Sequence, residues 1–346
     1  MSDYDLNTVA EVAASLAAQP KLHQVYESQF PDTYKQILKL LDSPFYRWYP
    51  FKDRNNEPNA QFGFCQSRHK NKWCTAGNRG GKTISGLMED VADCLMLDVI
   101  TKRPSDKYQQ PPQMWIVSDT EETAINVIER GIVTDVLGSD ESGFLWNFIR
   151  DEASYSEKGG FADHIIPWTN GATIQTKFST QKRNTFQGRK LDKVHHDEVQ
   201  PRDIYGECVA RLADRNGYFL GTMTPIYDEK RGGGIPWIYE ELYLQKTKKN
   251  IEFHNWSMLD NPYIPQEAKD RLLDQWDEDE IDARVYGQFV PMGVKLAFPT
   301  KLIRKVRNYT SDSRFDGHLT LADGRVSFVE QIDADYELAS VGQTPS

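Results

Sequence analysis

Residues 76–83 read Ala76-Gly77-Asn78-Arg79-Gly80-Gly81-Lys82-Thr83, and they lie between an apolar segment, 73–75, and a helix-like segment, 84–91. Polyphosphate is held by inward-turned backbone N–H groups at a helix N-terminus, together with a lysine and a hydroxyl that binds Mg²⁺. Glycines favour such a loop because they adopt backbone angles that other residues avoid. The spacing A-x-x-x-x-G-K-T departs from the usual pattern only at its first position, where Ala76 replaces glycine. The stretch predicts a phosphate-binding loop but leaves open what the nucleotide is used for.

The composition is typical of a soluble globular protein. The chain has 346 residues, of which 39% are hydrophobic and 27% are charged, so it can bury a large core. No run of about 18 apolar residues predicts a transmembrane helix, and the N-terminus lacks the pattern of a signal peptide. We therefore expect no membrane contact and a location in the cytoplasm of the cell that makes the protein.

The net charge and the cysteine content argue against two functional classes of protein. The net charge of −10 argues against a surface that coats nucleic acid on all sides, although a local basic groove is still possible. The four cysteines show no C-x-x-C spacing, which favours free thiols and argues against a zinc site.

The chain divides into three predicted parts. Residues 1–57 form a helical accessory segment and linker, with amphipathic helices expected near 7–18 and 31–41. This segment either packs on the rest of the chain or serves as a docking arm for a partner subunit. Residues 58–290 form the nucleotide domain, and residues 291–346 form a C-terminal linker and tail.

Strands and helices alternate through the nucleotide domain. Apolar strands are predicted at 73–75, 113–118, 191–196 and 218–222, with helices between them. A hairpin is expected from 165–168 and 173–176, joined across Asn170-Gly171, a favoured two-residue turn. The alternation predicts an α/β fold of the P-loop NTPase type, RecA/ASCE-like, with a mainly parallel sheet flanked by helices and a small β-hairpin insertion.

A second part of the site is predicted at Asp197 and Glu198, which end the strand that begins near 191. Asp197 is placed to hold Mg²⁺ together with Thr83, directly or through water, and Glu198 to act as the general base on water. His195 and His196 precede these acids, and neighbouring residues of a strand point to opposite faces. They cannot easily bind one ion together, so we assign both to packing.

Hydroxyl and guanidinium groups complete the predicted site. Thr222 and Thr224 end the strand at 218–222, where the carboxyl ends of parallel strands meet the ligand crevice. They are predicted to sense the γ-phosphate and relay its loss, or else to cap the strand end. Charge on the transferred phosphoryl group must be offset, and Arg79 lies within the loop itself. Arg130 and Arg189 are weaker candidates for that role.

Together these motifs resemble the ATPase domain of the large terminase subunit, the DNA-packaging motor of tailed bacteriophages. The resemblance runs from about Pro58 to Phe289. Its landmarks are the P-x-x-Q-x-x-F segment at 58–64, the loop at 76–83 with its arginine, and Phe186-Gln187-Gly188-Arg189 before the acids, followed by Gly221-Thr222-Met223-Thr224-Pro225, the D-N-P of Asp260-Asn261-Pro262, and the G-x-F of Gly287-Gln288-Phe289.

The resemblance implies roles and partners. Gln61 corresponds to the adenine-reading glutamine, with Gln66 as an alternative, and ATP and Mg²⁺ are the implied cofactors. Hydrolysis of ATP would drive double-stranded DNA into a preformed capsid, without regard to sequence, by contacts to its phosphates. The implied partners are the portal protein of the procapsid, the small terminase subunit and further copies of the chain in a ring. The implied location is the host cell cytoplasm.

Basic clusters are candidate DNA contacts. They occur at Lys182-Arg183, at Lys230-Arg231 and at Lys246 with Lys248-Lys249. Each could equally be a solvated face of the protein.

The chain also departs from the family pattern. Large terminases continue into a nuclease domain of the RNase H type, but only about 57 residues follow Phe289 here. The acids in 293–346 are better interpreted as turn residues, so we expect ATP hydrolysis without DNA cleavage. Two alternatives stay open: a helicase-like remodelling enzyme, and a non-catalytic assembly subunit that uses its nucleotide as a switch.

Overall fold

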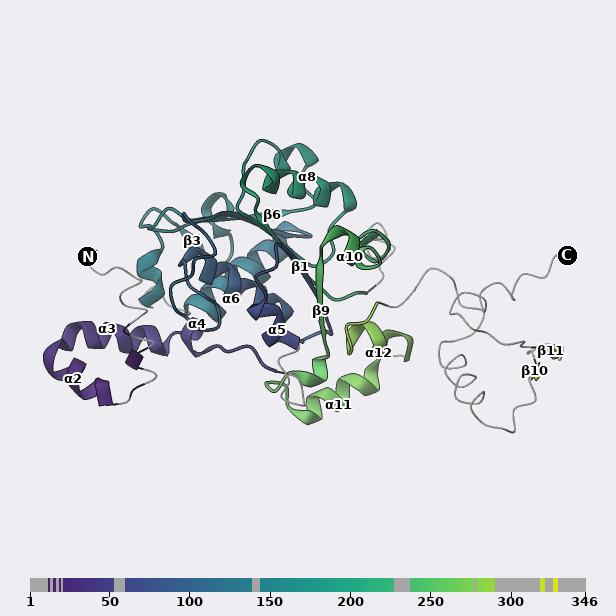
Figure 1. The fold of residues 1–346 in the computed structure, drawn as a ribbon, viewed down its shortest axis with the longest axis horizontal. Coiled ribbons are helices and arrows are strands. Elements are labelled where there is room, and N and C mark those ends of the chain that lie inside the picture. Colours follow the sequence, from purple (N-terminus) through teal and green to yellow (C-terminus); the bar gives the residue numbers. More distant parts are fainter. Residues whose placement is uncertain are drawn as a thin grey trace.

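A seven-stranded sheet forms the centre of the computed structural model (Figure 1). The structure describes residues 12, 15, 16, 19, 21–52, 60–138, 144–226, 237–276, 278–289, 318–320 and 326–328. The strand order is β5-β6-β2-β7-β8-β1-β9, and every neighbouring pair is parallel except β5 and β6. The strands are β1 (Asn71–Ala76), β2 (Gln113–Ser118), β3 (Tyr155–Ser156), β4 (Gly160–Phe161), β5 (Ile165–Pro167), β6 (Thr173–Phe178), β7 (Lys193–Asp197), β8 (Tyr218–Met223), β9 (Glu252–Trp256), β10 (His318–Thr320) and β11 (Val326–Phe328).

Helices join these strands. The α-helices are α2 (Lys21–Gln29), α3 (Pro31–Asp42), α4 (Pro44–Arg47), α5 (Ala60–Gln66), α6 (Lys82–Cys94), α7 (Glu121–Thr123), α8 (Arg202–Leu212), α10 (Lys246–Lys249), α11 (Gln266–Gln275) and α12 (Glu278–Arg284). The π-helices are η1 (Ala124–Glu129), η2 (Ile132–Leu137) and η8 (Ile238–Tyr243). The 3₁₀-helices are η3 (Phe144–Phe148), η4 (Ala162–His164), η5 (Arg183–Phe186), η6 (Ala213–Arg215) and η9 (Met258–Asp260).

The strand order confirms the predicted fold class. Strand β8 lies between β1, which leads into the phosphate loop, and β7, which ends at Asp197. Because parallel strands place their carboxyl ends at one edge of the sheet, the ends of β1, β7 and β8 meet there. A mainly parallel P-loop NTPase sheet with helices on both faces is therefore what the sequence predicted.

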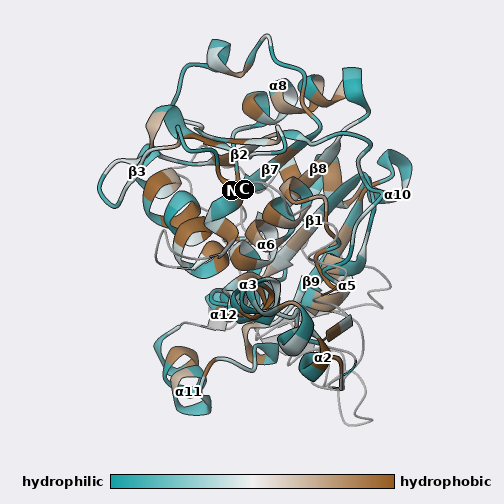
Figure 2. Cartoon of the chain, turned by 90° about the vertical axis from the view of Figure 1, so that its left-hand side faces the viewer, coloured by the Kyte–Doolittle hydropathy of each residue, from teal (hydrophilic) through white to brown (hydrophobic). Residues whose placement is uncertain are grey.

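Alternating side chains along the strands feed two separate cores. Cys74 and Ile116 belong to the core on the α6 side, whereas their neighbours Trp73 and Trp115 belong to the core on the α8 side. This is the period of two that a strand imposes, and it gives a three-layer arrangement. Hydrophobic residues of the central strands and the adjacent helices, brown in Figure 2, gather where these layers meet.

The N-terminal helices share the α6-side core. Ile37 and Leu40 of α3 and Phe45 of α4 are fully buried in the same cluster as Leu87 of α6. The predicted helix at 31–41 is present as α3, whereas most of the predicted helix at 7–18 lies outside the described residues. The described part of this segment thus packs on the nucleotide domain, while the division at residue 57 stays a prediction.

The predicted hairpin forms at one edge of the main sheet. Strand β5 pairs with β6 in an antiparallel register, and β6 continues the sheet by pairing in parallel with β2. The connecting turn has three residues, 169–171, instead of the predicted two, because the N–H of Trp168 donates to the carbonyl of Ala172 at 2.9 Å. Gly171, its last residue, has a φ of +98°, as this kind of turn requires. The predicted tail, 291–346, lies outside the described residues apart from β10 and β11, which pair with each other.

The cysteines and the longer helices were also subjects of prediction. All four cysteines are buried and free of disulfide bonds. Among the helices that the structure describes, none combines the length and the apolar character that crossing a membrane requires.

Candidate nucleotide-binding site

The phosphate loop, 77–81, connects β1 to the first turn of α6. Gly81 has a φ of +76°, a left-handed conformation that glycine adopts without strain, and Lys82 begins the helix directly after it. Arg79 also has a positive φ, +58°, and its side chain is exposed. The N–H groups of Gly77, Asn78 and Gly80 donate to protein carbonyls. The helix N-terminus leaves the N–H groups of the first residues of α6 without an intrahelical partner. That they hold a phosphate stays a prediction.

Lys82 and Glu198 meet at the carboxyl edge of the sheet. The Nζ atom of Lys82 lies 2.9 Å from Oε1 of Glu198, and Lys82 is almost fully buried. Burial disfavours the charged lysine, but the carboxylate of Glu198 outweighs it and raises the pKa of Lys82 above its usual value. The ammonium group thus keeps its charge inside the protein, where a phosphate would meet it.

Glu198 is held in an uncommon backbone conformation. Its φ is +66°, its N–H donates to the carbonyl of Thr222 at 2.7 Å, and its Oε2 accepts from the N–H of Thr224 at 3.1 Å. A non-glycine residue in this region costs free energy and persists only where its surroundings hold it. The chain therefore turns sharply after β7 and fixes the carboxylate beside Lys82.

Three oxygen-bearing side chains converge next to this pair. Asp197 Oδ1 accepts from the hydroxyl of Thr83 at 3.0 Å and from the hydroxyl of Thr222 at 2.8 Å. A hydroxyl and one carboxylate fit Mg²⁺, which takes few protein ligands and keeps water and substrate phosphates as the others. No group of three or more histidine, cysteine or acidic side chains in the described residues offers a ligand set of another kind.

Gln61 contacts the phosphate loop directly. Its side chain is buried, its Nε2 donates to the carbonyl of Gly81 at 3.0 Å, and its Oε1 accepts from the N–H of Phe51 at 3.0 Å. Gln61 therefore ties the loop to the chain before α5. Its predicted contact with adenine stays a prediction, and the first residues of the matching segment, 58 and 59, lie outside the described residues.

Residues from the C-terminal half of the domain hold the backbone of the loop. Asn261 donates its amide to the carbonyl of Arg79 at 2.8 Å, the indole of Trp256 donates to the carbonyl of Gly80 at 2.6 Å, and the N–H of Asn78 donates to the carbonyl of Arg284 at 2.6 Å. Asn261 belongs to the D-N-P segment, which was predicted only as a landmark, and Trp256 precedes that segment. The sequence offered no signal for their contacts with the loop beyond the amide and indole donors themselves.

The chain is similar in sequence to a phage protein. The chain is 24% identical to the large terminase subunit of Salmonella phage P22 over 234 residues, which are 61% of this chain and 46% of that protein. Over that stretch the chain is similar to this large terminase subunit. This confirms the resemblance that the motifs predicted, and the chain spans about half the length of the curated relative it matches. No protein-family model matches it.

Solved terminase structures resemble the fold. The ATPase domain of the large terminase of Thermus phage P74-26 matches with a TM-score of 0.47 and 16% identity, over 68% of this chain and 95% of that one. A large terminase from a thermophilic bacteriophage, solved in complex with ADP, matches with a TM-score of 0.48 and 15% identity, over 70% of this chain and 54% of that one.

The predicted coupling residue Thr224 and the candidate DNA contacts differ in their surroundings. Thr224 is buried, and its hydroxyl has no hydrogen-bond partner among the described residues. Of the basic clusters, Arg183 pairs with Glu207 at 2.7 Å, and the lysines of α10 are exposed. Lys230-Arg231 lies outside the described residues.

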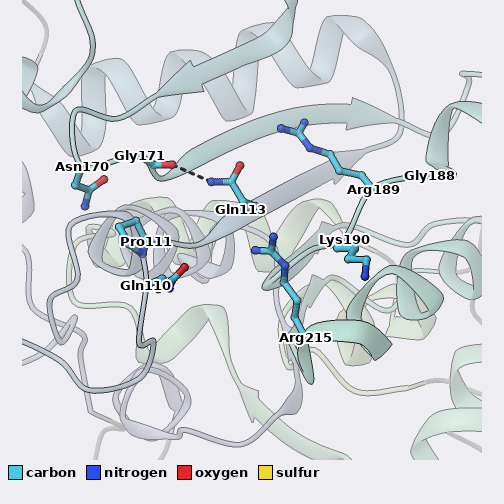
Figure 3. Close-up of a pocket in the computed structure, with 9 residues that line it drawn as sticks. All are labelled: Gln110, Pro111, Gln113, Asn170, Gly171, Gly188, Arg189, Lys190 and Arg215. Atoms are coloured by element: carbon cyan, nitrogen blue, oxygen red, sulfur yellow. Dashed lines mark hydrogen bonds between the residues drawn. The ribbon is translucent and has the colours of Figure 1, made fainter.

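A polar cavity of about 530 Å³ lies at the amino ends of the strands, opposite the phosphate loop (Figure 3). Arg189, Lys190 and Arg215 line it, and each has an interaction partner. Arg189 donates to Gln175 at 2.9 Å, Lys190 lies 3.4 Å from Asp214, and Arg215 lies 2.6 Å from Asp192. Lys190 and Arg215 are thus paired with acids, whereas Arg189 bonds to a neutral amide. Arg189 lies at the amino ends of the strands, away from Lys82 and Glu198.

Proposed function

We propose that this chain binds and hydrolyses ATP with Mg²⁺ and that hydrolysis drives double-stranded viral DNA into a preformed capsid. The proposal is supported mainly by one convergence. Lys82 lies 2.9 Å from Glu198, and Thr83 lies 3.0 Å from Asp197, although more than a hundred residues separate each pair along the chain. The similarity to the P22 large terminase subunit gives this ATP site its purpose.

The proposed mechanism assigns one task to each group. Backbone N–H groups at the start of α6 and the ammonium of Lys82 would bind the phosphates. Thr83 and Asp197 would hold Mg²⁺, which would offset charge on the phosphate oxygens. Glu198 accepts a proton from the attacking water, since its carboxylate is fixed at the end of β7 beside the phosphate site. Arg79 stabilises charge on the transferred phosphoryl group, and Gln61 binds adenine.

The coupling step is assigned to β8. Thr222 bonds to Asp197, and the N–H of Thr224 bonds to Glu198, so both groups touch the acids that surround the γ-phosphate. Loss of that phosphate would alter these contacts and shift the strand end. The DNA contacts proposed are exposed lysines of α10 and Lys182, acting on phosphates.

The proposed partners follow from the packaging role. They are double-stranded DNA, the portal protein of the procapsid, the small terminase subunit and other copies of this chain in a ring. The proposed location is the host cell cytoplasm.

The test compares ATP turnover by the wild-type protein and by Glu198→Gln, with and without DNA. We expect turnover to fall by about 10²- to 10⁴-fold because the proton acceptor is lost, while ATP still binds. Glu241→Gln is the matched control, since Glu241 is a half-exposed partner of Arg202 and should leave turnover within about twofold.

Two outcomes would overturn the proposal. Equal turnover in the wild type and Glu198→Gln would remove Glu198 from catalysis, and absence of turnover in the wild type would favour a nucleotide switch. An assay of capsid filling against strand separation then distinguishes a packaging motor from a helicase-like enzyme.

A further inference from the structure

His195 lies at the centre of a buried chain of hydrogen bonds. Its Nδ1 is 2.7 Å from Oδ2 of Asp90, and its Nε2 is 2.8 Å from the hydroxyl of Thr222. Thr222 in turn is 2.8 Å from Asp197. Each of these side chains is at most 3% exposed. The chain of contacts therefore ends at the carboxylate that we assign to Mg²⁺, and packing alone does not describe His195.

Helix α6 is shaped to receive the imidazole ring. Gly86 lies inside α6, where glycine is less favourable than alanine by about 1 kcal/mol. A Cβ atom at Gly86 would lie 2.3 Å from Cε1 of His195, so no other residue fits unless the ring moves. Asp90 lies one turn later on the same face of the helix, and its Oδ2 is the hydrogen-bond partner of Nδ1 of the ring.

The hydroxyl of Thr222 is held between the ring and Asp197. Its proton points to Asp197, which as a carboxylate can only accept. Nε2 of His195 lies 2.8 Å from the same hydroxyl and is its partner on the other side. The ring thus fixes the rotamer of Thr222, and Thr222 occupies one lone pair of Asp197 Oδ1 while Thr83 occupies another.

The far end of the chain is anchored in a cluster of buried charges. Asp90 lies 2.8 Å from the ammonium of Lys193, which also pairs with Asp93 at 2.7 Å. Both carboxylates lie on α6, the helix that begins with Lys82 and Thr83. Asp90 is therefore held in place from a second side, and it can orient the ring without moving itself.

We propose that His195, oriented by Asp90, is a positioning residue that sets the Asp197 carboxylate for Mg²⁺ through the hydroxyl of Thr222. The proposal rests on the proposed function, since it concerns the same metal ligand. Groups that orient a ligand in this way commonly change metal affinity by 10- to 100-fold when removed. A side chain that only packs would change stability and leave metal affinity unaltered.

The test measures Mg²⁺ dependence by nucleotide binding and by turnover. The affinity for a fluorescent ADP analogue is measured at increasing Mg²⁺ concentrations, and again in EDTA, for the wild type, His195→Leu and His195→Gln. We expect His195→Leu to raise the half-saturating Mg²⁺ concentration at least tenfold, with affinity in EDTA unchanged. His195→Gln keeps an amide that can hydrogen-bond to Thr222 and should recover most of the loss. In turnover, kcat should fall while the KM for ATP at saturating Mg²⁺ stays within about twofold.

His196 provides a matched control on the same strand. It is equally buried, faces the other side of the sheet against Phe219, and its ring nitrogens have no hydrogen-bond partner among the described residues. His196→Leu should therefore leave the Mg²⁺ dependence unchanged, although both leucine variants lose stability. Thermal unfolding of each variant shows that the proteins compared are folded.

Thr222→Val keeps the inference falsifiable if His195→Leu does not fold. This variant should show the same rise in half-saturating Mg²⁺, and adding His195→Gln to it should change nothing further. Equal Mg²⁺ dependence in the wild type, Thr222→Val and the His195 variants would overturn the inference while leaving the ATPase proposal intact. If the wild type itself neither binds Mg²⁺ with nucleotide nor hydrolyses ATP, the proposed function fails instead.

Discussion

Two groups of ion pairs in this protein differ in how far they are buried. The cluster beneath α6 joins Lys72, Lys107 and Lys193 to three acids, Glu89, Asp90 and Asp93, and all six side chains are at most 10% exposed. The cavity in Figure 3 joins Lys190 and Arg215 to Asp214 and Asp192, with Lys190 67% and Arg215 41% exposed.

The difference teaches where charge matters in this fold. In the cavity, water screens each pair, so the pairs add little free energy and transmit nothing. Beneath α6 the charges are buried, so each depends on its partners, and the cluster connects through Asp90 and His195 to Thr222. Position relative to the helix, rather than residue type, therefore decides whether a lysine is structural.

The largest expected difference is between Lys193→Met and Lys190→Met, only three residues apart. Lys193→Met leaves Asp90 and Asp93 buried without their shared cation and should lower the free energy of unfolding by about 3–5 kcal/mol. Lys190→Met removes an exposed pair and should change it by less than about 0.5 kcal/mol. Urea unfolding of both variants measures this, and equal losses would show that burial does not separate the two regions.

Acid should destabilise the protein through the buried cluster. Burial alone would raise the pKa of Glu89, but Lys107, Lys72 and Lys193 outweigh it and lower that pKa well below 4.5. The unfolded chain therefore takes up this proton first, so the stabilisation is complete above about pH 4.5 and is lost as the pH falls through the lower, folded-state pKa.

The measurement is the free energy of unfolding between pH 7 and pH 3. Each proton taken up only on unfolding contributes at most about 1.4 kcal/mol per pH unit to the slope. Glu89→Gln should flatten the acid side of the curve, whereas Asp214→Asn in the exposed pair should leave the slope unaltered. A wild-type curve that stays level down to pH 3 would contradict the expected shift.

Local patterns predicted the sheet and the phosphate loop. The apolar strands, the glycines and the A-x-x-x-x-G-K-T spacing are short-range signals, and the meeting of Lys82 with Glu198 follows from parallel strands sharing one edge. The contacts of Asn261 and Trp256 with the loop could not be predicted in this way. They join residues about 180 positions apart through side chains that have no periodicity.

His195 shows a second limit of sequence reasoning. Alternation along a strand predicted that His195 and His196 face opposite sides, which the contacts of the two rings bear out. Their different chemistry depends on what each face contains. One face presents Asp90 and Thr222, and the other presents aromatic rings, so only the packed fold separates a hydrogen-bonded histidine from a packed one.

A small effect is also expected of Arg215→Gln in the cavity. Its pair with Asp192 is short, 2.6 Å, but Asp192 also accepts from the N–H of Gln113 at 2.7 Å and so keeps a partner after the change. The loss should be no more than about 1 kcal/mol in unfolding free energy, with ATP turnover within twofold of the wild type. A larger drop in turnover with stability unchanged would mean that the amino ends of the strands take part in the reaction cycle. Burial would then no longer distinguish the cluster beneath α6 from the cavity, because both would be connected to the nucleotide site.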